Sequence, residues 1–358
     1  MGGYIQGGGH SPLSSIKGIA ADHVLSYSVV LPSGNFVTTS STLNQDLFFA
    51  LRGGGGNTFG IVTSVTVKAY PGFPVTGTRF TFGVTDTVSY DSFWAGVRAY
   101  FNYFIPLTDA GTYGYFHVFP GPAPSFLMAP FFAPNLTISE TQALLNPWLT
   151  DLAILGIIVT PEFYYYPNYL AGWEASFPQE TIGEDDGITG SRLFPRCNWL
   201  NESLLNATFD AWKSSTDQGS FTINFMFAPR YTGPGEDDTA VNPAFRQALM
   251  HAIQGASWVE NGTRTDILAG RNNLTARQQV WRDVSPGAGA YLGESDREEV
   301  DFEQSFYGYH YPALLEVKRK YDPWELLWVK TGVGSEGWAV VTSDPINDEN
   351  GPLCRVSA

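Results

Sequence analysis

Two glycine-rich stretches are the residues best suited to chemistry, because glycine lets the backbone approach a bound group closely. The first covers residues 7–11, Gly-Gly-Gly-His-Ser, and the second covers residues 53–58, Gly-Gly-Gly-Gly-Asn-Thr. Glycine also adopts backbone conformations that are forbidden to other residues. A flat cofactor with a pyrophosphate would meet this need, and so would the close packing of one turn on another.

Three common chemistries lack their motifs. Neither glycine stretch has the Gly-X-Gly-X-X-Gly spacing, and no lysine follows the glycines as a phosphate-binding loop requires. The five histidines never form His-Glu-X-X-His, and Ser335 lacks the spacing of a nucleophile elbow. Nucleoside triphosphate chemistry, zinc proteolysis and serine hydrolysis are therefore disfavoured, and no metal is expected.

Charge and composition narrow the class of partner. The 358 residues are 43% hydrophobic and 15% aromatic, which is ample for a buried core. The 20 basic and 35 acidic residues give a net charge of -15, which opposes binding to nucleic acid or to an anionic membrane. Since no apolar run approaches the roughly 18 residues of a membrane span, we expect neither nucleic acid nor membrane as a partner.

Several features favour a secreted glycoprotein. Two cysteines, Cys197 and Cys354, are too few for a disulfide framework and are left open as paired or free. No leader precedes Tyr4, so we expect Met1 to be an internal methionine of a longer protein. Five Asn-X-Ser/Thr sequons occur, at Asn135, Asn201, Asn206, Asn261 and Asn273.

The first 72 residues predict short strands and tight turns. Residues 25–31 and 36–39 flank Pro-Ser-Gly-Asn and predict a hairpin. Residues 44–52 predict a short helix with Asn44 as its cap. Residues 61–70 alternate as a half-buried strand, in which Ile61, Val65 and Val67 face one side.

The rest of the chain mixes helices and strands. Helices are predicted over 89–104, 242–253 and 311–321, and a strand over 221–227. The aromatic run at 163–169 either lines a pocket for a sugar or aromatic ligand or forms a core strand edge and loop.

The glycine stretches belong to longer motifs that resemble a known family. Residues 4–11, 18–24 and 46–61 resemble, in order and spacing, the second half of the FAD-binding domain of the vanillyl-alcohol-oxidase / p-cresol-methylhydroxylase superfamily. Residues 306–323 resemble the closing segment of its berberine-bridge-enzyme-like branch, in the fungal style. The middle matches loosely, chiefly at residues 190–196.

The resemblance implies an α+β fold with a PCMH-type flavin lobe and a substrate domain built on an antiparallel sheet with flanking helices. Residues 1–72 would form the second flavin lobe, 73–300 the substrate domain, 301–340 the segment that returns to the flavin lobe, and 341–358 a tail. The family's first lobe, which carries the phosphate-binding loop and the usual covalent histidine, has no counterpart.

The resemblance implies FAD as cofactor. His310 stands where the family has asparagine, so it either changes hydrogen bonding to cofactor or substrate or packs at the helix start. The implied cofactor-binding residues are Gly7, Gly8, Gly9, His10, Ser11, Val24, Gly60, Ile61, Tyr307 and His310.

The catalytic candidates come from residues 289–296, which resemble an active-site stretch of the family with Gly293 in place of its asparagine. Oxidation of an alcohol needs a base for the hydroxyl proton while hydride passes to flavin. Glu294 and Tyr291 are the candidates for that base, and an acidic surface loop before a helix would explain the same residues.

The function implied is an FAD-dependent oxidoreductase that oxidises an alcohol, carbohydrate or secondary metabolite. Its partners would be a small-molecule substrate and molecular oxygen or another electron acceptor. Two alternatives are a non-catalytic truncated product that binds no FAD, and an extracellular carbohydrate-binding protein.

Overall fold

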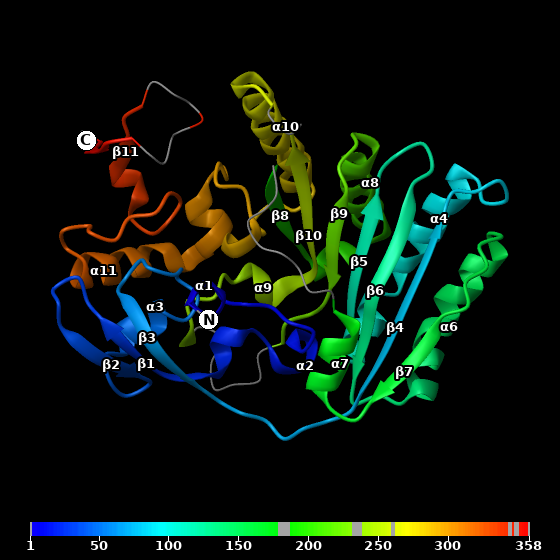
Figure 1. Cartoon of the computed structure of the whole chain (residues 1–358), viewed down its shortest axis with the longest axis horizontal. Coiled ribbons are helices and arrows are strands. Elements are labelled where there is room, and N and C mark those ends of the chain that lie inside the picture. Colours follow the sequence, from blue (N-terminus) through cyan, green and yellow to red (C-terminus); the bar gives the residue numbers. More distant parts are fainter. Residues whose placement is uncertain are drawn as a thin grey trace.

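The computed structural model describes residues 2–177, 187–230, 238–258, 262–342, 346 and 351–356. Met1 and the sequon at Asn261 lie outside the described residues. Figure 1 shows a small sheet formed by the beginning of the chain and a large sheet formed by its middle, with the C-terminal helix α11 beside the small sheet. The mixed α+β class is confirmed.

The large sheet contains seven strands in the order β7-β4-β6-β5-β9-β10-β8 in the described residues. Every neighbouring pair is antiparallel, as the resemblance implied. The strands are β4 (Val75–Gly83), β5 (Tyr113–Phe119), β6 (Ser125–Pro134), β7 (Glu162–Tyr166), β8 (Gly187–Pro195), β9 (Thr222–Met226) and β10 (Ala248–Ser257).

Long helices cover one face of this sheet and enclose an aromatic core. Trp148 stacks on Tyr100 with ring centroids 4.2 Å apart, and its indole N–H donates to the Gly96 carbonyl at 3.0 Å. The predicted helix over 89–104 is confirmed as α4, and Ser89 caps it by accepting from the Ser92 amide. The helices are α4 (Tyr90–Asn102), α5 (Phe104–Asp109), α6 (Ile138–Ile154), α8 (Glu202–Asp217) and α10 (Arg264–Asp283).

The small sheet has the order β2-β1-β3 and is also antiparallel. The predicted hairpin and the helix over 311–321 are confirmed, and α11 packs with α3 and the small sheet in one core that includes Leu47, Phe59 and Leu314. The elements are β1 (Val24–Val30), β2 (Phe36–Ser40), α3 (Gln45–Ala50), β3 (Ile61–Val67) and α11 (Tyr311–Tyr321). The shorter elements are α1 (Gly2–Gln6), α2 (Ser14–Lys17), α7 (Tyr169–Ser176), α9 (Ala244–Gln247), β11 (Trp338–Val340) and β12 (Leu353–Arg355).

The helix predicted over 242–253 is wrong. Only the short α9 is helical there, and β10 follows it at once between β8 and β9. The physical reason is that β10 is buried on both faces over residues 248–254. Apolar residues therefore occur on both faces of this segment, and the sequence shows no alternation that would distinguish a central strand from a buried helix.

Two local predictions in the small sheet are corrected by the structure. Asn44 is the N-cap residue of α3, as predicted, but its side chain does not cap the helix, because the residue has a left-handed backbone and its amide donates to the Thr38 carbonyl at 2.8 Å. The strand β3 is not half-buried, since Ile61 and Val67 are 44% and 43% exposed. As an edge strand it pairs only with β1, and no second layer covers these side chains within the described residues.

Two further points concern the chain as a whole. Cys197 and Cys354 are both free and exposed. Among the described residues, every helix is too short or too polar to cross a bilayer.

The partly buried His117 in β5 should make the protein less stable in acid. Burial, with a smaller contribution from Arg79, lowers the pKa of His117 from 6.5 to about 4. Between these two pH values His117 is protonated in the unfolded chain but neutral in the folded chain. The free energy of unfolding therefore falls as the pH drops. We expect His117 to remove about 2 kcal/mol of unfolding free energy between pH 7 and pH 4, after allowance for its partial exposure.

Urea denaturation of the wild type and His117→Gln at both pH values measures this contribution. The variant should lose less stability than the wild type on acidification. Equal losses in the two proteins would contradict the prediction.

Candidate functional site

The two glycine stretches meet at Gln6. Its backbone carbonyl accepts hydrogen bonds from the amides of both Gly53 and Gly55, each at 3.0 Å. The side-chain Oε1 of Gln6 is buried and has no hydrogen-bond partner among the described residues. The two glycine stretches, which begin 46 residues apart in the sequence, therefore lie side by side in the fold. The unpartnered Oε1 atom of Gln6 lies beside them.

Close packing of the chain on itself accounts for several of the glycines. A Cβ on Gly53, whose φ is +124°, would lie 2.2 Å from the Val241 amide nitrogen. A Cβ on Gly9, whose φ is +80°, would lie 2.8 Å from the Tyr4 ring. Of the two explanations that the sequence left open for these glycines, the close packing of turns therefore accounts for Gly53 and Gly9. Gly8, with φ +114°, has no neighbour closer than 3.5 Å to its Cβ position.

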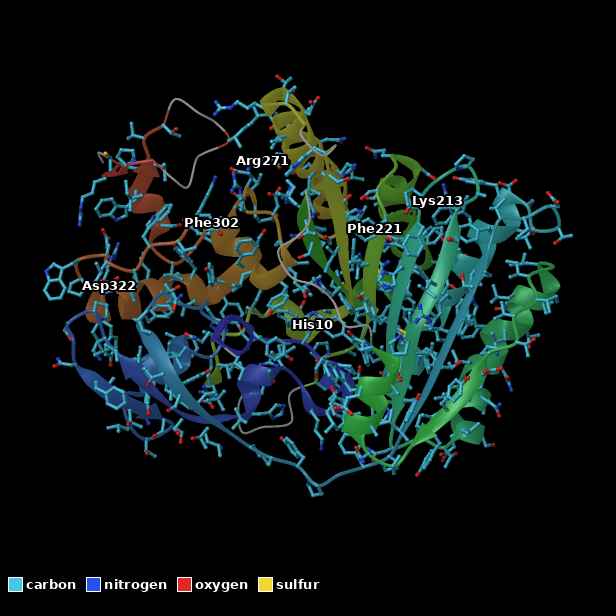
Figure 2. All side chains as sticks on the ribbon, viewed as in Figure 1. His10, Lys213, Phe221, Arg271, Phe302 and Asp322 are labelled. Atoms are coloured by element: carbon cyan, nitrogen blue, oxygen red, sulfur yellow. The ribbon has the colours of Figure 1, made fainter. Side chains whose placement is uncertain are left out.

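A carboxylate and two imidazoles meet where the first glycine stretch approaches the large sheet. Glu294 Oε2 lies 3.1 Å from His10 Nε2 and 2.9 Å from His251 Nε2. His10 follows the first glycine stretch, His251 lies in the middle of β10, and Glu294 ends the short 3-10 helix over Leu292–Glu294. Figure 2 shows His10 in the region between the small sheet and the large one.

Aromatic rings surround this cluster. His251 stacks on Phe225 of β9 with centroids 5.4 Å apart, and the His10 ring lies 4.7 Å from the same phenyl ring. Tyr291 meets the His10 ring edge-on at 5.6 Å and is 4% exposed. The imidazoles are therefore held by packing and by the shared carboxylate.

The charges of the cluster follow from burial and hydrogen bonding. Burial opposes the charge of Glu294, but His10 and His251 outweigh it and hold the pKa of that carboxyl well below its usual range. Burial lowers the pKa of His251, while Glu294 opposes that shift. Burial, aided by Glu294, raises the pKa of Tyr291, so its phenol stays protonated. The cluster thus carries an ionised carboxylate at neutral pH.

A cleft of about 370 Å³ opens beside the cluster. Glu294 faces it with a side chain that is 37% exposed, whereas Tyr291 does not line it. The aromatic run at 163–169 divides between its two interpretations, since it forms the edge strand β7 and also supplies Tyr169 to the cleft. The cleft is lined by Tyr4, His10, Ser11, Pro12, Tyr113, Tyr115, Tyr169, Trp173, Phe177, Phe225 and Glu294.

The other predicted cofactor residues are spread more widely. Val24 pairs with Val67, while Ile61 pairs with Val30 at the opposite end of β1, so Val24 and Ile61 are not brought together. A Cβ on Gly60 would lie 2.5 Å from the Val29 side chain, which explains that glycine by packing.

The returning segment contributes the last two predicted cofactor residues, Tyr307 and His310. Tyr307 lies near the second glycine stretch, and His310 lies beside helix α3. Tyr307 is buried and donates to the Thr331 carbonyl at 3.0 Å, and its hydroxyl lies 3.7 Å from the Cβ position of Gly55. His310 is buried at the start of α11, with its ring 5.3 Å from that of Phe49.

Sequence reasoning missed His251 and Phe225. His251 falls in the segment that was predicted as a helix, so no pairing with β9 or with residue 294 could be deduced. A strand assignment for 248–257, together with its register against β9, would have placed His251 beside Phe225, because these two residues are paired across β9 and β10.

The cluster also has the residue types of a metal site. The ligand atoms of His10, His251 and Glu294 lie within 4.8 Å of one another. Metal-binding imidazoles normally donate their second N–H to a carbonyl or carboxylate. The buried Nδ1 of His10 has no such partner among the described residues, so at least one of the two imidazoles lacks the support that a metal ligand normally has.

Comparison with known proteins supports the flavoprotein resemblance. Residues 290–334 match the family "Berberine and berberine like". The chain is 34% identical over 358 residues to the FAD-linked oxidoreductase patO of Aspergillus clavatus, covering 99% of this chain and 60% of that protein. It is 32% identical over 368 residues to the VAO-type flavoprotein oxidase VAO615 of Thermothelomyces thermophilus, with 99% and 60% covered. The chain thus spans about 60% of the length of these curated relatives.

The fold agrees with solved structures. The VAO-type flavoprotein MtVAO615 from Myceliophthora thermophila C1 superposes with a TM-score of 0.88 at 30% identity, covering 99% of this chain and 63% of that one. Berberine bridge enzyme from Eschscholzia californica, at 16% identity, shares the fold with a TM-score of 0.70 over 93% of this chain and 69% of that one. By sequence and by fold, this chain is therefore similar to FAD-linked oxidoreductases and VAO-type flavoproteins, and its residues 290–334 match the berberine-like family.

Proposed function

We propose that this chain is the substrate-binding part of an FAD-dependent oxidoreductase that removes hydride from a carbon bearing a hydroxyl group. The observation that carries the proposal is the ionised carboxylate of Glu294, held by two imidazoles and exposed to an aromatic cleft. Bound FAD would supply the acceptor for the hydride. Glu294 would supply the acceptor for the hydroxyl proton.

A carboxylate of low basicity is sufficient for this step. As hydride leaves the carbon, the hydroxyl becomes that of a protonated carbonyl, which is a strong acid. Glu294 Oε2 forms hydrogen bonds with both imidazoles, and these contacts fix the carboxylate in place beside the cleft. A positioned base of this kind contributes about 10² to 10⁴-fold to a rate.

The residues present fit a flavin beside the first glycine stretch. Gln6 offers a buried acceptor without a partner among the described residues, and a Cβ at Gly8 would make only an ordinary contact with Ile19 at 3.5 Å, so steric crowding does not account for that glycine. Residues 7–11 would hold the cofactor with their backbone. Tyr307 lies beside the second glycine stretch, where its ring would form one boundary of the cofactor site.

Aromatic walls support a substrate with a ring, such as a sugar or an aromatic metabolite. Tyr115 stacks on Phe225 at 4.9 Å and on Phe177 at 6.2 Å, so these rings line one continuous side of the cleft. Flat aromatic faces suit sugars and aromatic rings alike. The class proposed is an alcohol, carbohydrate or secondary metabolite, with molecular oxygen or another acceptor taking the electrons.

Uptake of FAD by the purified chain tests the proposal. A flavin absorbance that stays with the protein through gel filtration and bleaches when an alcohol or sugar substrate is added would support it. A protein that stays colourless after incubation with FAD would favour the non-catalytic alternative. Glycan binding by a colourless protein would favour the carbohydrate-binding alternative.

Removal of His251 should shift the acid limb of activity to higher pH. His251 is one of two groups that lower the pKa of Glu294, so His251→Leu should raise that pKa. The base would then be protonated at a higher pH, and the rate of flavin reduction should begin to fall about one pH unit earlier on acidification. Stopped-flow reduction from pH 7 down to the lowest pH at which both proteins stay folded measures the limb, and coincident limbs would contradict the assignment of the base.

We also propose that the protein is secreted and glycosylated. In support, the four described sequon asparagines are exposed. Asn135 offers an exposed side chain on a turn, whereas Asn201 caps α8 and Asn206 accepts from Arg98. Expression in a secreting host should give a protein whose mass falls on endoglycosidase treatment, and removal of the asparagines by Asn→Gln should abolish that fall. An unchanged mass of the secreted wild type would contradict glycosylation.

A further inference from the structure

A second cavity among the described residues lies away from the cleft. It has a volume of about 600 Å³ and lies where β8, β10 and the turn that leads into β9 meet α10. No residue lines both the cavity and the cleft. Figure 2 shows Phe221, which lines the cavity, well apart from His10. Along β10, Gly255 of the cavity is four residues from His251, about 13 Å in an extended strand.

Arg277 of α10 lines this cavity with a buried charge. The residue is only 6% exposed. Its Nη2 donates to the Gly255 carbonyl at 2.7 Å, and its buried Nε has no hydrogen-bond partner among the described residues. No carboxylate in the described part of the chain lies within ion-pair distance of it. By contrast, Arg282, five residues further along α10, pairs with Glu299 at 2.7 Å.

A buried guanidinium without a counter-charge is unfavourable. Buried charges in proteins are normally paired and fully hydrogen-bonded, because removing an ion from water is costly. The chain has 35 acidic and only 20 basic residues, so carboxylates are abundant. The described part of the fold nevertheless provides none for Arg277 and leaves a cavity beside it.

We propose that this cavity is a second binding site, for a small monocarboxylate with an apolar body. A planar guanidinium matches a carboxylate through two parallel hydrogen bonds, and a single cation balances a single negative charge. Phe221 and Trp258 provide apolar walls for the body of the ligand, and Thr189 and Asn273 provide polar groups at the cavity.

Glycines make the space for such a ligand. Gly255 and Gly270 line the cavity, and the Cβ positions of these two residues lie 3.5 Å from the Phe221 ring and 3.4 Å from the Trp258 ring. A larger side chain at Gly270 would therefore enter the cavity. Because Gly270 lies within α10 and has no positive φ, a side chain there is compatible with the helix.

Calorimetric titration of the full chain with benzoate tests the proposal, with neutral benzamide and inorganic phosphate as ligand controls. We expect saturable binding of benzoate, and binding of benzamide and of phosphate weaker by at least about tenfold. Arg277→Gln should weaken benzoate binding by a similar factor. Gly270→Leu should do the same by filling the cavity, and it decides the outcome if Arg277→Gln fails to fold.

Ala269→Leu is the matched control, because it adds the same side chain at an exposed position one residue away on α10. This variant should bind benzoate like the wild type. Absence of saturable benzoate binding would overturn the site. Equal binding by the wild type and Gly270→Leu would place the ligand elsewhere, and phosphate binding as tight as that of benzoate would overturn the monocarboxylate assignment. None of these results depends on FAD.

Discussion

Replacement of Glu294 by glutamine should slow the reduction of bound flavin by substrate by about 10² to 10³-fold. The amide retains the size of the carboxylate but cannot take the hydroxyl proton. It also cannot accept both imidazole N–H groups as a charged group does, so the hydrogen bonds at 3.1 and 2.9 Å weaken together. The loss should appear in the rate constant at saturating substrate, because the aromatic walls of the cleft are unchanged.

Stopped-flow measurement of flavin absorbance gives this rate constant directly. Glu316→Gln, an exposed position on α11 outside the cleft, is the matched control and should reduce at the wild-type rate. Reduction of Glu294→Gln at the wild-type rate would show that Glu294 is not the base.

Tyr291→Phe separates the two residues that the sequence offered for the same role. The Tyr291 ring is buried beside His10 and Phe245, and its phenol does not line the cleft. Burial raises the pKa of Tyr291, so its phenol already carries a proton at neutral pH and does not take up the substrate's. We expect the rate of Tyr291→Phe to fall by no more than about threefold, since only packing and one buried hydroxyl change.

Much of the fold could be predicted because the local pattern and the tertiary environment agree. The hairpin at 24–40 has strand residues on both sides of a turn sequence, and α11 has Pro312 at its first turn and one apolar side. In both cases the amphipathic pattern faces the same core that buries Leu47 and Leu314. Such elements can be predicted from the sequence because their local pattern agrees with the tertiary core against which they pack.

The failures have physical causes that local patterns do not contain. β10 lies between two strands and is buried on both faces, so its sequence shows neither the alternation of a strand nor the period of a helix. The side-chain amide of Asn44 donates to the Thr38 carbonyl of the preceding strand, and this contact depends on how β2 and α3 are placed. Tertiary contacts decide both cases.

The candidate site was predicted only in part for the same reason. His10 and Glu294 could be selected individually, because one follows a glycine stretch and the other lies in a stretch that resembles an active site. Their direct contact spans 284 residues of sequence. The third member, His251, becomes visible only when the register of β9 and β10 is known.

The largest effect on stability should come from a buried ion pair beneath the second glycine stretch. Lys318 and Asp322 are one turn apart at the end of α11, and Lys318 Nζ lies 2.7 Å from Asp322 Oδ2. Asp322 also accepts from the amides of Leu326 and Leu327, each at 2.9 Å. Lys318 donates to the carbonyl of Thr58 at 2.8 Å. The pair therefore ties the returning segment to the loop over 53–58, at the edge of the molecule where Figure 2 labels Asp322.

Asp322→Ala should lower the free energy of unfolding by about 3–5 kcal/mol, because it leaves the Lys318 ammonium buried without its counter-ion and two amides without an acceptor. Urea denaturation at pH 7 measures the loss. Lys320→Met is the matched control, because it removes an exposed ion pair. The side chains of Lys320 and Asp46 in that pair are 60% and 38% exposed, so its loss should lower the free energy of unfolding by less than about 1 kcal/mol. Losses of similar size in the two variants would contradict the assignment. Because Lys318 holds the Thr58 carbonyl, Asp322→Ala should also weaken FAD uptake at temperatures where the protein remains folded, which would connect the C-terminal return directly to the glycine stretch.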